Sequence, residues 1–174
     1  MLWLMILLVV GMVFAPAMWL RPSARERRLG RLREAAARVE VNVRLEDGPL
    51  HGNGDKLAAY RWFYPALRPG PGFLLVREAH ASASLKSYVA GWRWRVEPLR
   101  PLSPQVNALF ARLLSQLPDD AVAVQSSDKA LTVWWDESLE AEDFVRFAAP
   151  ASALRDVLQG NPDRRSGGVP NTPP

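Results

Sequence analysis

The sequence predicts an α+β protein with one N-terminal transmembrane helix, a basic juxtamembrane helix, and then a small antiparallel sheet with about two packed helices. Three observations lead to this fold class. The first twenty residues carry no charged side chain, and the next eighteen are rich in arginine. The remaining chain holds short segments with apolar residues at every second position, together with two segments of helical periodicity. Sequential strands with helices on one face are typical of α+β domains.

Residues 1–20 are predicted to form a membrane anchor. A helix of this length reaches about 30 Å, the thickness of the hydrocarbon core of a bilayer. Trp3 and Trp19 lie near its ends, where indole rings favour the headgroup region. Gly11 and Ala15 have the small-residue spacing through which two such helices could pair. A homo-oligomer through the anchor is therefore one expectation, and the lipid bilayer is the first expected partner.

A cleaved signal peptide is the alternative for this segment, because residues 15–17 (Ala-Pro-Ala) resemble a cleavage site. Against it, no Lys or Arg precedes the apolar run, and the residues that follow are strongly basic. A retained span with this flank obeys the positive-inside rule. Abundant Arg, Ala, Leu and Pro with scarce Lys indicate a GC-rich bacterial genome. We therefore expect a single-pass protein of the cell inner membrane, with its N-terminus outside and its C-terminal domain in the cytoplasm.

Residues 21–38 form the predicted juxtamembrane helix. Ser23 can cap its start, and Glu26 completes a capping box. Basic residues beside a bilayer attract anionic headgroups, although the same arginines could serve only to fix the topology. The arginines expected at the membrane surface are Arg21, Arg25, Arg27, Arg28, Arg31 and Arg33.

The positive charge of the chain belongs to this segment alone. The chain is formally +4, and residues 21–40 hold seven arginines against three glutamates. Outside them, basic and acidic residues balance at fifteen each. A neutral domain argues against a nucleic-acid partner, because such domains usually carry a basic face of their own. The absence of cysteine excludes disulfides and thiol catalysis.

Residues 39–160 are predicted to form one α+β domain, and residues 161–174 a disordered tail rich in proline. Tyr60, Trp62 and Tyr64 should share one face of a strand, with Arg61 and Phe63 on the other. Strands are predicted at residues 39–45, 57–64, 73–78, 89–97, 121–125 and 130–136. Helices are predicted at residues 23–38, 103–117 and 140–159, the last interrupted near Pro150.

Tryptophans supply the candidate interaction surface of the domain. Aromatic residues alternate with arginine in Trp-Arg-Trp-Arg (residues 92–95), and two tryptophans end a predicted hairpin at residues 134–135. Exposed tryptophans often mark binding surfaces. The same pattern also arises when these rings simply pack into the core. The candidate residues are Trp92, Trp94, Trp134 and Trp135.

Candidate catalytic and metal-binding groups are sparse. An acidic cluster at residues 136–143 lies at the start of a predicted helix, where carboxylates stabilise the helix dipole, and no histidine is near it in sequence. His51 lies in a glycine-rich loop that completes no known phosphate or calcium motif. We therefore predict no catalytic residue, no metal site and no cofactor, and the chain is not expected to be an enzyme.

The span followed by Arg-Pro-Ser-Ala-Arg-Glu-Arg-Arg-Leu-Gly resembles small bacterial inner-membrane proteins called YajC-like preprotein translocase subunits. The later Ala-Tyr-Arg, the Leu-rich helix and Val-Trp-Trp-Asp-Glu are also similar to that group. The resemblance implies a membrane location; the YajC family itself is a one-span accessory of the Sec translocon. The Gly-Asp-x-Val-x-Thr-x-Gly-Gly strand–turn of the YajC family itself is absent, so no functional residue is transferred.

The function predicted from these features is that of a protein-interaction module on a cytoplasmic domain. Association with a translocase is one form that this function could take. One alternative is a module that binds an anionic lipid surface through the basic helix. Another is a small-ligand-binding or enzymatic domain, which would require a concave pocket lined by convergent polar groups.

Overall fold

The structure is a computed structural model that describes residues 3, 5–6, 23–50, 56–89 and 91–162 of the chain. Its helices are α2 (Ala24–Arg38), α3 (Pro104–Gln116) and α4 (Ala141–Leu158), with a short 3-10 helix η1 (Glu78–His80). Its strands are β1 (Asn42–Asp47), β2 (Lys56–Phe63), β3 (Phe73–Arg77), β4 (Ser87–Val89), β5 (Trp92–Val96), β6 (Ala123–Ser126) and β7 (Ala130–Trp135).

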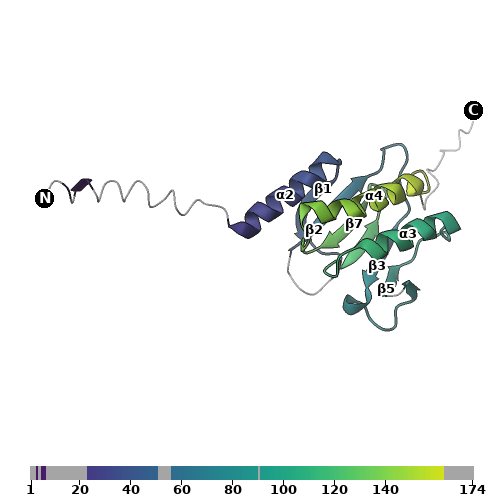
Figure 1. Ribbon diagram of the computed structural model, residues 1–174. Helices are drawn as coiled ribbons and strands as arrows, with labels where there is room; N and C mark the ends of the chain where they lie inside the picture. Colours follow the sequence, from purple (N-terminus) through teal and green to yellow (C-terminus); the bar gives the residue numbers. More distant parts are fainter. Residues whose placement is uncertain (1–2, 4, 7–22, 51–55, 90, 163–174) are drawn as a thin grey trace, which may run out of the picture.

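The seven strands form one antiparallel sheet in the order β1-β2-β7-β6-β3-β5-β4. Helices α2, α3 and α4 lie together on one face of this sheet (Figure 1). The α+β class, the antiparallel sheet and the single helical layer agree with the prediction. Three helices pack on the sheet, whereas about two were expected, because α2 also docks against the domain.

The main core lies between the sheet and the helices. Tyr60 of β2 and Trp135 of β7 are completely buried there, with ring centroids 5.1 Å apart. Phe144 and Phe147 of α4 cover these two rings at 5.5 Å and 5.4 Å respectively. The predicted alternation of β2 is confirmed, because Tyr60 and Trp62 face this core while Arg61 and Phe63 point to the opposite side. The sheet consequently has one helix-covered face and one helix-free face.

Local capping explains why two helices begin where the sequence predicts. The Ser23 hydroxyl accepts a hydrogen bond from the Glu26 amide, and the Glu26 carboxylate accepts one from the Ser23 amide, which completes the predicted capping box of α2. The Ser103 hydroxyl accepts a hydrogen bond of 3.3 Å from the Val106 amide at the start of α3, and Pro104 occupies the first turn, where a missing N–H costs nothing.

Two predicted strand boundaries and one predicted helix interruption were wrong. The strand expected from residue 39 begins only at Asn42, because Glu40 has a positive φ of 59° and turns the chain after α2. The single strand expected at residues 89–97 is instead the pair β4 and β5, which turn near Gly91 with its φ of 82°. Helix α4 runs unbroken through Pro150, which is buried within it.

The predicted membrane span requires a correction. Of residues 1–20 only Trp3, Met5 and Ile6 lie within the described residues. Over the part of the chain that the structure describes, every helix is too short or too polar to cross a bilayer. The reason is composition, since α2 is rich in arginine and α4 carries charges in its first and last turns. Within the described residues this finding contradicts the predicted transmembrane helix and, with it, the predicted single-pass location in the inner membrane; residues 1–2, 4 and 7–20 of the predicted span lie outside the described residues. The expected disordered tail lies outside the described residues from residue 163 onward.

Candidate functional site

The helix-free face of the sheet carries a row of polar side chains across four neighbouring strands. In an antiparallel sheet, residues directly opposite each other on adjacent strands project to the same face. Arg61 of β2 is opposite Thr132 of β7, and Thr132 is opposite Gln125 of β6. Asn42 of β1 extends the row to the edge of the sheet, because it is opposite Arg61. Strand register therefore brings together residues that are far apart in sequence.

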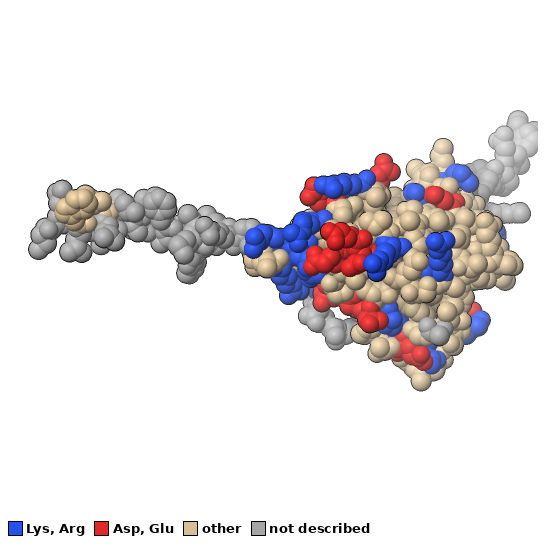
Figure 2. Space-filling view, in the orientation of Figure 1, with Lys and Arg blue, Asp and Glu red and all other residues tan. Residues whose placement is uncertain are grey.

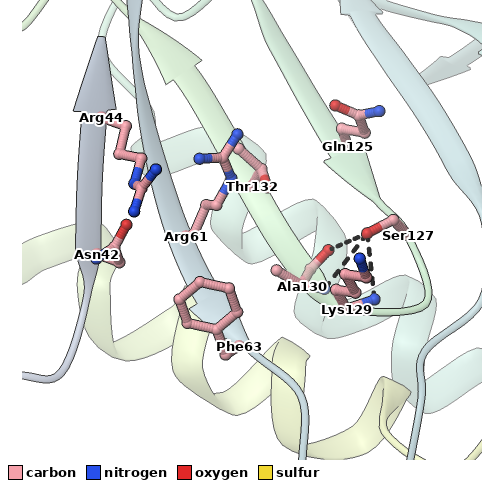
Figure 3. Close-up of a pocket in the computed structure, with 9 residues that line it drawn as sticks. All are labelled: Asn42, Arg44, Arg61, Phe63, Gln125, Ser127, Lys129, Ala130 and Thr132. Atoms are coloured by element: carbon pink, nitrogen blue, oxygen red, sulfur yellow. Dashed lines mark hydrogen bonds between the residues drawn. The ribbon is translucent and has the colours of Figure 1, made fainter. Parts of the chain in front are cut away.

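This row forms the floor and sides of a hollow of about 530 Å³, which we call the polar hollow. In Figure 3, Arg44 and Arg61 extend over the strands β1 and β2, while Ser127 and Lys129 come from the turn between β6 and β7. Phe63 closes one side with a half-exposed ring. The lining residues are Asn42, Arg44, Arg61, Phe63, Gln125, Ser127, Lys129, Ala130 and Thr132.

The charge of the polar hollow is positive. Arg44, Arg61 and Lys129 line it, and no Asp or Glu is among its lining residues. Arg61 donates two hydrogen bonds, of 2.8 and 2.5 Å, to the Glu46 carboxylate, and this guanidinium holds the pKa of Glu46 below its usual range. Arg44 and Lys129 have no ion pair within 4.0 Å with any residue that the structure describes, while the charge of Arg44 contributes to lowering the pKa of Glu46. These two cations are therefore available to an anionic group.

Hydrogen bonds and a cation–π contact hold the lining of the hollow in place. Trp134 lies beside the hollow on the same face of the sheet, two residues after Thr132; it is only 5% exposed, and its indole N–H donates a hydrogen bond of 3.2 Å to Gln125 Oε1. The Arg61 guanidinium lies 5.9 Å from the centre of the Trp134 ring, within the range of a cation–π contact. The Ser127 hydroxyl accepts a hydrogen bond of 3.2 Å from the Lys129 amide and so fixes the turn. Lining groups on strands and a fixed turn require little reordering when a ligand binds.

The four tryptophans predicted as an interaction surface are all interior residues. Trp92 and Trp94 are 3% and 6% exposed on the helix-covered side, and Trp135 is completely buried under α4. Trp134 lies on the helix-free side, where it is buried in a second apolar cluster against which Leu50 and Leu57 pack. The alternating pattern of β5 is therefore that of a strand with its aromatic side chains in the core, and these rings are corrected from surface to core residues.

Among the arginines predicted at a membrane surface, the structure separates those with exposed side chains from those that contact the chain's own domain. Arg21 lies outside the described residues, and Arg25 and Arg27 have exposed side chains. Figure 2 shows the helix-covered face, where basic side chains gather over α2 and acidic ones lie beside them at the start of α4. Arg28, Arg31 and Arg33 contact the chain's own domain.

These contacts form a clamp that fixes α2 to the loop after β7. Arg28 Nη1 donates hydrogen bonds of 2.9, 2.7 and 3.0 Å to the carbonyl oxygens of residues 137, 138 and 139. Arg33 donates two hydrogen bonds, of 2.9 and 2.5 Å, to the Glu137 carboxylate. The Tyr60 hydroxyl donates a third, of 2.9 Å, to the same carboxylate. Arg31 lies 3.7 Å from Glu140 in a more exposed ion pair.

Glu137 is the residue at this clamp that sequence reasoning missed. It is 4% exposed and adopts a positive φ of 57°, an unfavourable backbone conformation for a residue with a Cβ. Burial and the adjacent carboxylate both raise the pKa of Tyr60 above its usual range, so this hydroxyl stays protonated. Because both Glu137 oxygens bind Arg33 or Tyr60, we interpret the group as structural.

The predicted acidic cluster and histidines form no metal centre in the described part of the chain. His51 lies outside the described residues, and His80 is exposed at the end of η1. Within the described ranges, no three side chains of His, Cys, Asp or Glu come together as a metal ion would require.

Comparison of the chain with protein-family models, with curated proteins and with solved structures finds no match. The resemblance to YajC-like subunits is thus left as a prediction from the sequence.

Proposed function

We propose that this domain is a protein-interaction module and that its polar hollow binds an acidic segment of a partner protein. The observation that carries the proposal is the pair of cations, Arg44 and Lys129, which line the hollow without an ion-pair partner among the described residues. Carboxylates of a bound segment that reach either cation would gain charge-assisted hydrogen bonds, which are stronger than those between neutral groups.

The shape of the hollow favours an extended segment. Its lining comes from four strands, so its length follows the direction across the sheet. Asn42 and Gln125 offer amide groups that can both donate and accept hydrogen bonds with a peptide backbone. Phe63 is 49% exposed at the margin and offers an apolar contact to a neighbouring side chain. An acidic residue flanked by an apolar one suits this arrangement.

The lining supports binding and offers little for catalysis. Acyl or glycosyl transfer usually requires a nucleophile beside a general base, most often His, Asp or Glu. None of these bases lines the polar hollow. Its two hydroxyl groups belong to Ser127, which holds the turn, and to Thr132, which is 5% exposed.

A small anionic molecule is the second candidate ligand. A volume of about 530 Å³ lies in the usual range for small-molecule sites, which is roughly 300–1,000 Å³. A lipid surface is less favoured, because Arg28, Arg31 and Arg33 of the basic helix contact the chain's own domain.

The test measures binding of a fluorescent peptide of alternating Glu and Val to the full-length chain. The protein is kept in a non-ionic detergent because residues 1–20 are uncharged. Lys129→Glu should weaken binding by at least about ten-fold, which corresponds to roughly 1.4 kcal/mol. Arg112→Glu is the matched control, since it makes the same charge change at an exposed position of α3 on the helix-covered side.

Two further measurements separate the alternatives. The same peptide with Gln in place of Glu should bind more weakly, and added salt should weaken binding of the acidic peptide by screening. Equal effects of Lys129→Glu and Arg112→Glu would refute the polar hollow as the site. Saturable binding of citrate that depends on Lys129, without binding of the peptide, would favour the small-ligand candidate.

A further inference from the structure

Strand β1 is an open edge of the sheet; charged residues lie on it, but it is not shortened, bulged or interrupted by proline. It is the first strand in the sheet order and pairs only with β2 in the described part of the chain. Its six residues contain no proline, and its pairing with β2 has no bulge. The opposite edge, β4, has three residues and an irregular register. Natural proteins usually protect open edges by shortness, bulges or proline, because unpaired backbone groups attract another strand.

The side chains of β1 carry a specific pattern. Arg44 and Glu46 project to the helix-free face, and Val43 and Leu45 to the helix-covered face, because side chains alternate along a strand. Leu45 is 50% exposed although it belongs to the apolar side. Arg44 has no ion-pair partner among the described residues, and it lies two residues from the acidic Glu46.

We infer that β1 pairs with β1 of a second copy of this chain, in antiparallel orientation, with Leu45 opposite Leu45 of the second copy on the twofold axis. This register places Arg44 opposite Glu46 of the other chain twice. Cross-strand pairs of opposite charge stabilise antiparallel sheets. The two sheets then continue into one, and both polar hollows open on the same face.

Other registers are less favourable on the same grounds. A slip that sets Arg44 opposite its own copy, or Glu46 opposite its own copy, brings like charges together, which is destabilising. A slip by one residue pairs positions that belong on opposite faces of the sheet, and it is therefore excluded when one face is buried. Only the register centred on Leu45 joins the opposite charges and also covers the exposed leucine.

The existing ion pair of Glu46 is compatible with this contact. Glu46 already accepts two hydrogen bonds from Arg61 of its own chain. A carboxylate has about four acceptor positions, so Arg44 of the second copy can bind the remaining ones. The inference rests on the edge strand and its charges. It commits Arg44 to Glu46 of the second copy, which leaves Lys129 as the cation of the polar hollow that has no ion pair among the described residues.

The test exploits the absence of cysteine in the chain. Single-cysteine variants of the full-length protein, in non-ionic detergent, are oxidised with copper phenanthroline and followed on non-reducing gels. Directly opposite residues have Cα atoms about 4.5–5.5 Å apart, within the range that a disulfide spans. Leu45→Cys should therefore form dimers at least about ten-fold faster than Leu67→Cys, because pairing raises the effective concentration of the thiols. Leu67 is a matched control, 95% exposed in a surface loop.

A mixture of Arg44→Cys and Glu46→Cys tests the register, since it should cross-link faster than either variant alone. Light scattering of the cysteine-free protein should give the mass of two chains, and Arg44→Glu should lower it to one. Equal cross-linking at residues 45 and 67, or a dimer that Arg44→Glu leaves intact, would overturn the inference. Lys129→Glu should leave the cross-linking at residue 45 unchanged, which separates this result from the test of the proposed function.

Discussion

Replacing Glu137 by alanine should lower the free energy of unfolding by about 3 kcal/mol, through two separable losses. The first concerns Tyr60, whose side chain is completely buried and whose hydroxyl donates to Glu137. A buried hydroxyl left without a partner costs about 1–3 kcal/mol, and we take about 2. The second is the ion pair with Arg33, whose side chain is 37% exposed. Because water can solvate that guanidinium once the carboxylate is gone, we assign it about 1 kcal/mol.

A second variant separates the two losses. Glu137→Gln keeps an oxygen that can accept from Tyr60 but removes the negative charge beside Arg33. Its cost should be about 1 kcal/mol, roughly the share of the ion pair alone. Glu40→Ala controls for the backbone, because Glu40 also has a positive φ, of 59°, but an exposed side chain. It should change the stability by less than about 0.5 kcal/mol, as surface substitutions usually do.

The assay is urea unfolding of the full-length chain, followed by tryptophan fluorescence. Trp135 is a local reporter, since its ring lies 5.1 Å from that of Tyr60. The reasoning would be refuted if Glu137→Ala destabilised the protein no more than Glu40→Ala. It would also be refuted if the Ala and Gln variants were equal, because the Tyr60 hydroxyl would then contribute nothing.

Four further predictions concern single sites. Burial raises the pKa of Tyr64 to about 12 from its ordinary 10.0, so stability should be constant below pH 10 and fall between pH 10 and about 12, with a slope that Tyr64→Phe reduces in pH-dependent urea unfolding. Gly70→Ala should cost about 2 kcal/mol in the same assay, because a Cβ there would lie 2.3 Å from the Tyr64 ring. Gly30→Ala, which meets no atom within 4 Å on α2, should instead stabilise by up to about 1 kcal/mol. Ser103→Ala should lower the helical stability of α3 by about 1 kcal/mol and reduce amide protection in its first turn, as measured by hydrogen exchange.

Elements with local signals were predictable from the sequence. The capping box at Ser23, the Ser-Pro start of α3 and the alternation of β2 each involve residues close together in the chain, and all three are present. The errors occur where a single backbone conformation decides the outcome. Glu40 and the turn near Gly91 both depend on a positive φ, which apolar periodicity does not reveal. The continuity of α4 through Pro150 depends on its packing against the core, which overrides the weak helix preference of proline.

The candidate site could not be predicted because it depends on strand order. Asn42, Arg61, Thr132 and Gln125 meet only through the pairing of β1, β2, β7 and β6. Nothing in the local sequence of any one strand indicates its neighbours. The basic helix misled for a related reason, because Arg28 and Arg33 find their partners more than a hundred residues later. The one usable signal was the alternation of Arg61 and Phe63 with buried aromatics in β2.

The order of the strands also governs when this domain can fold during synthesis. Strand β2 is held in the sheet on its inner side by β7, which is made about seventy residues later. Strand β3 likewise cannot complete its pairing until β6 is made. Its other neighbour, β5, is made earlier and pairs both with β3 and with β4. Non-local pairing of this kind slows folding and exposes unpaired strands in the meantime. The hairpin of β6 and β7 thus joins the pair β1 and β2 to the group β3, β5 and β4. If translation stalls before this hairpin is made, the edges of β2 and β3 that it would cover stay unpaired.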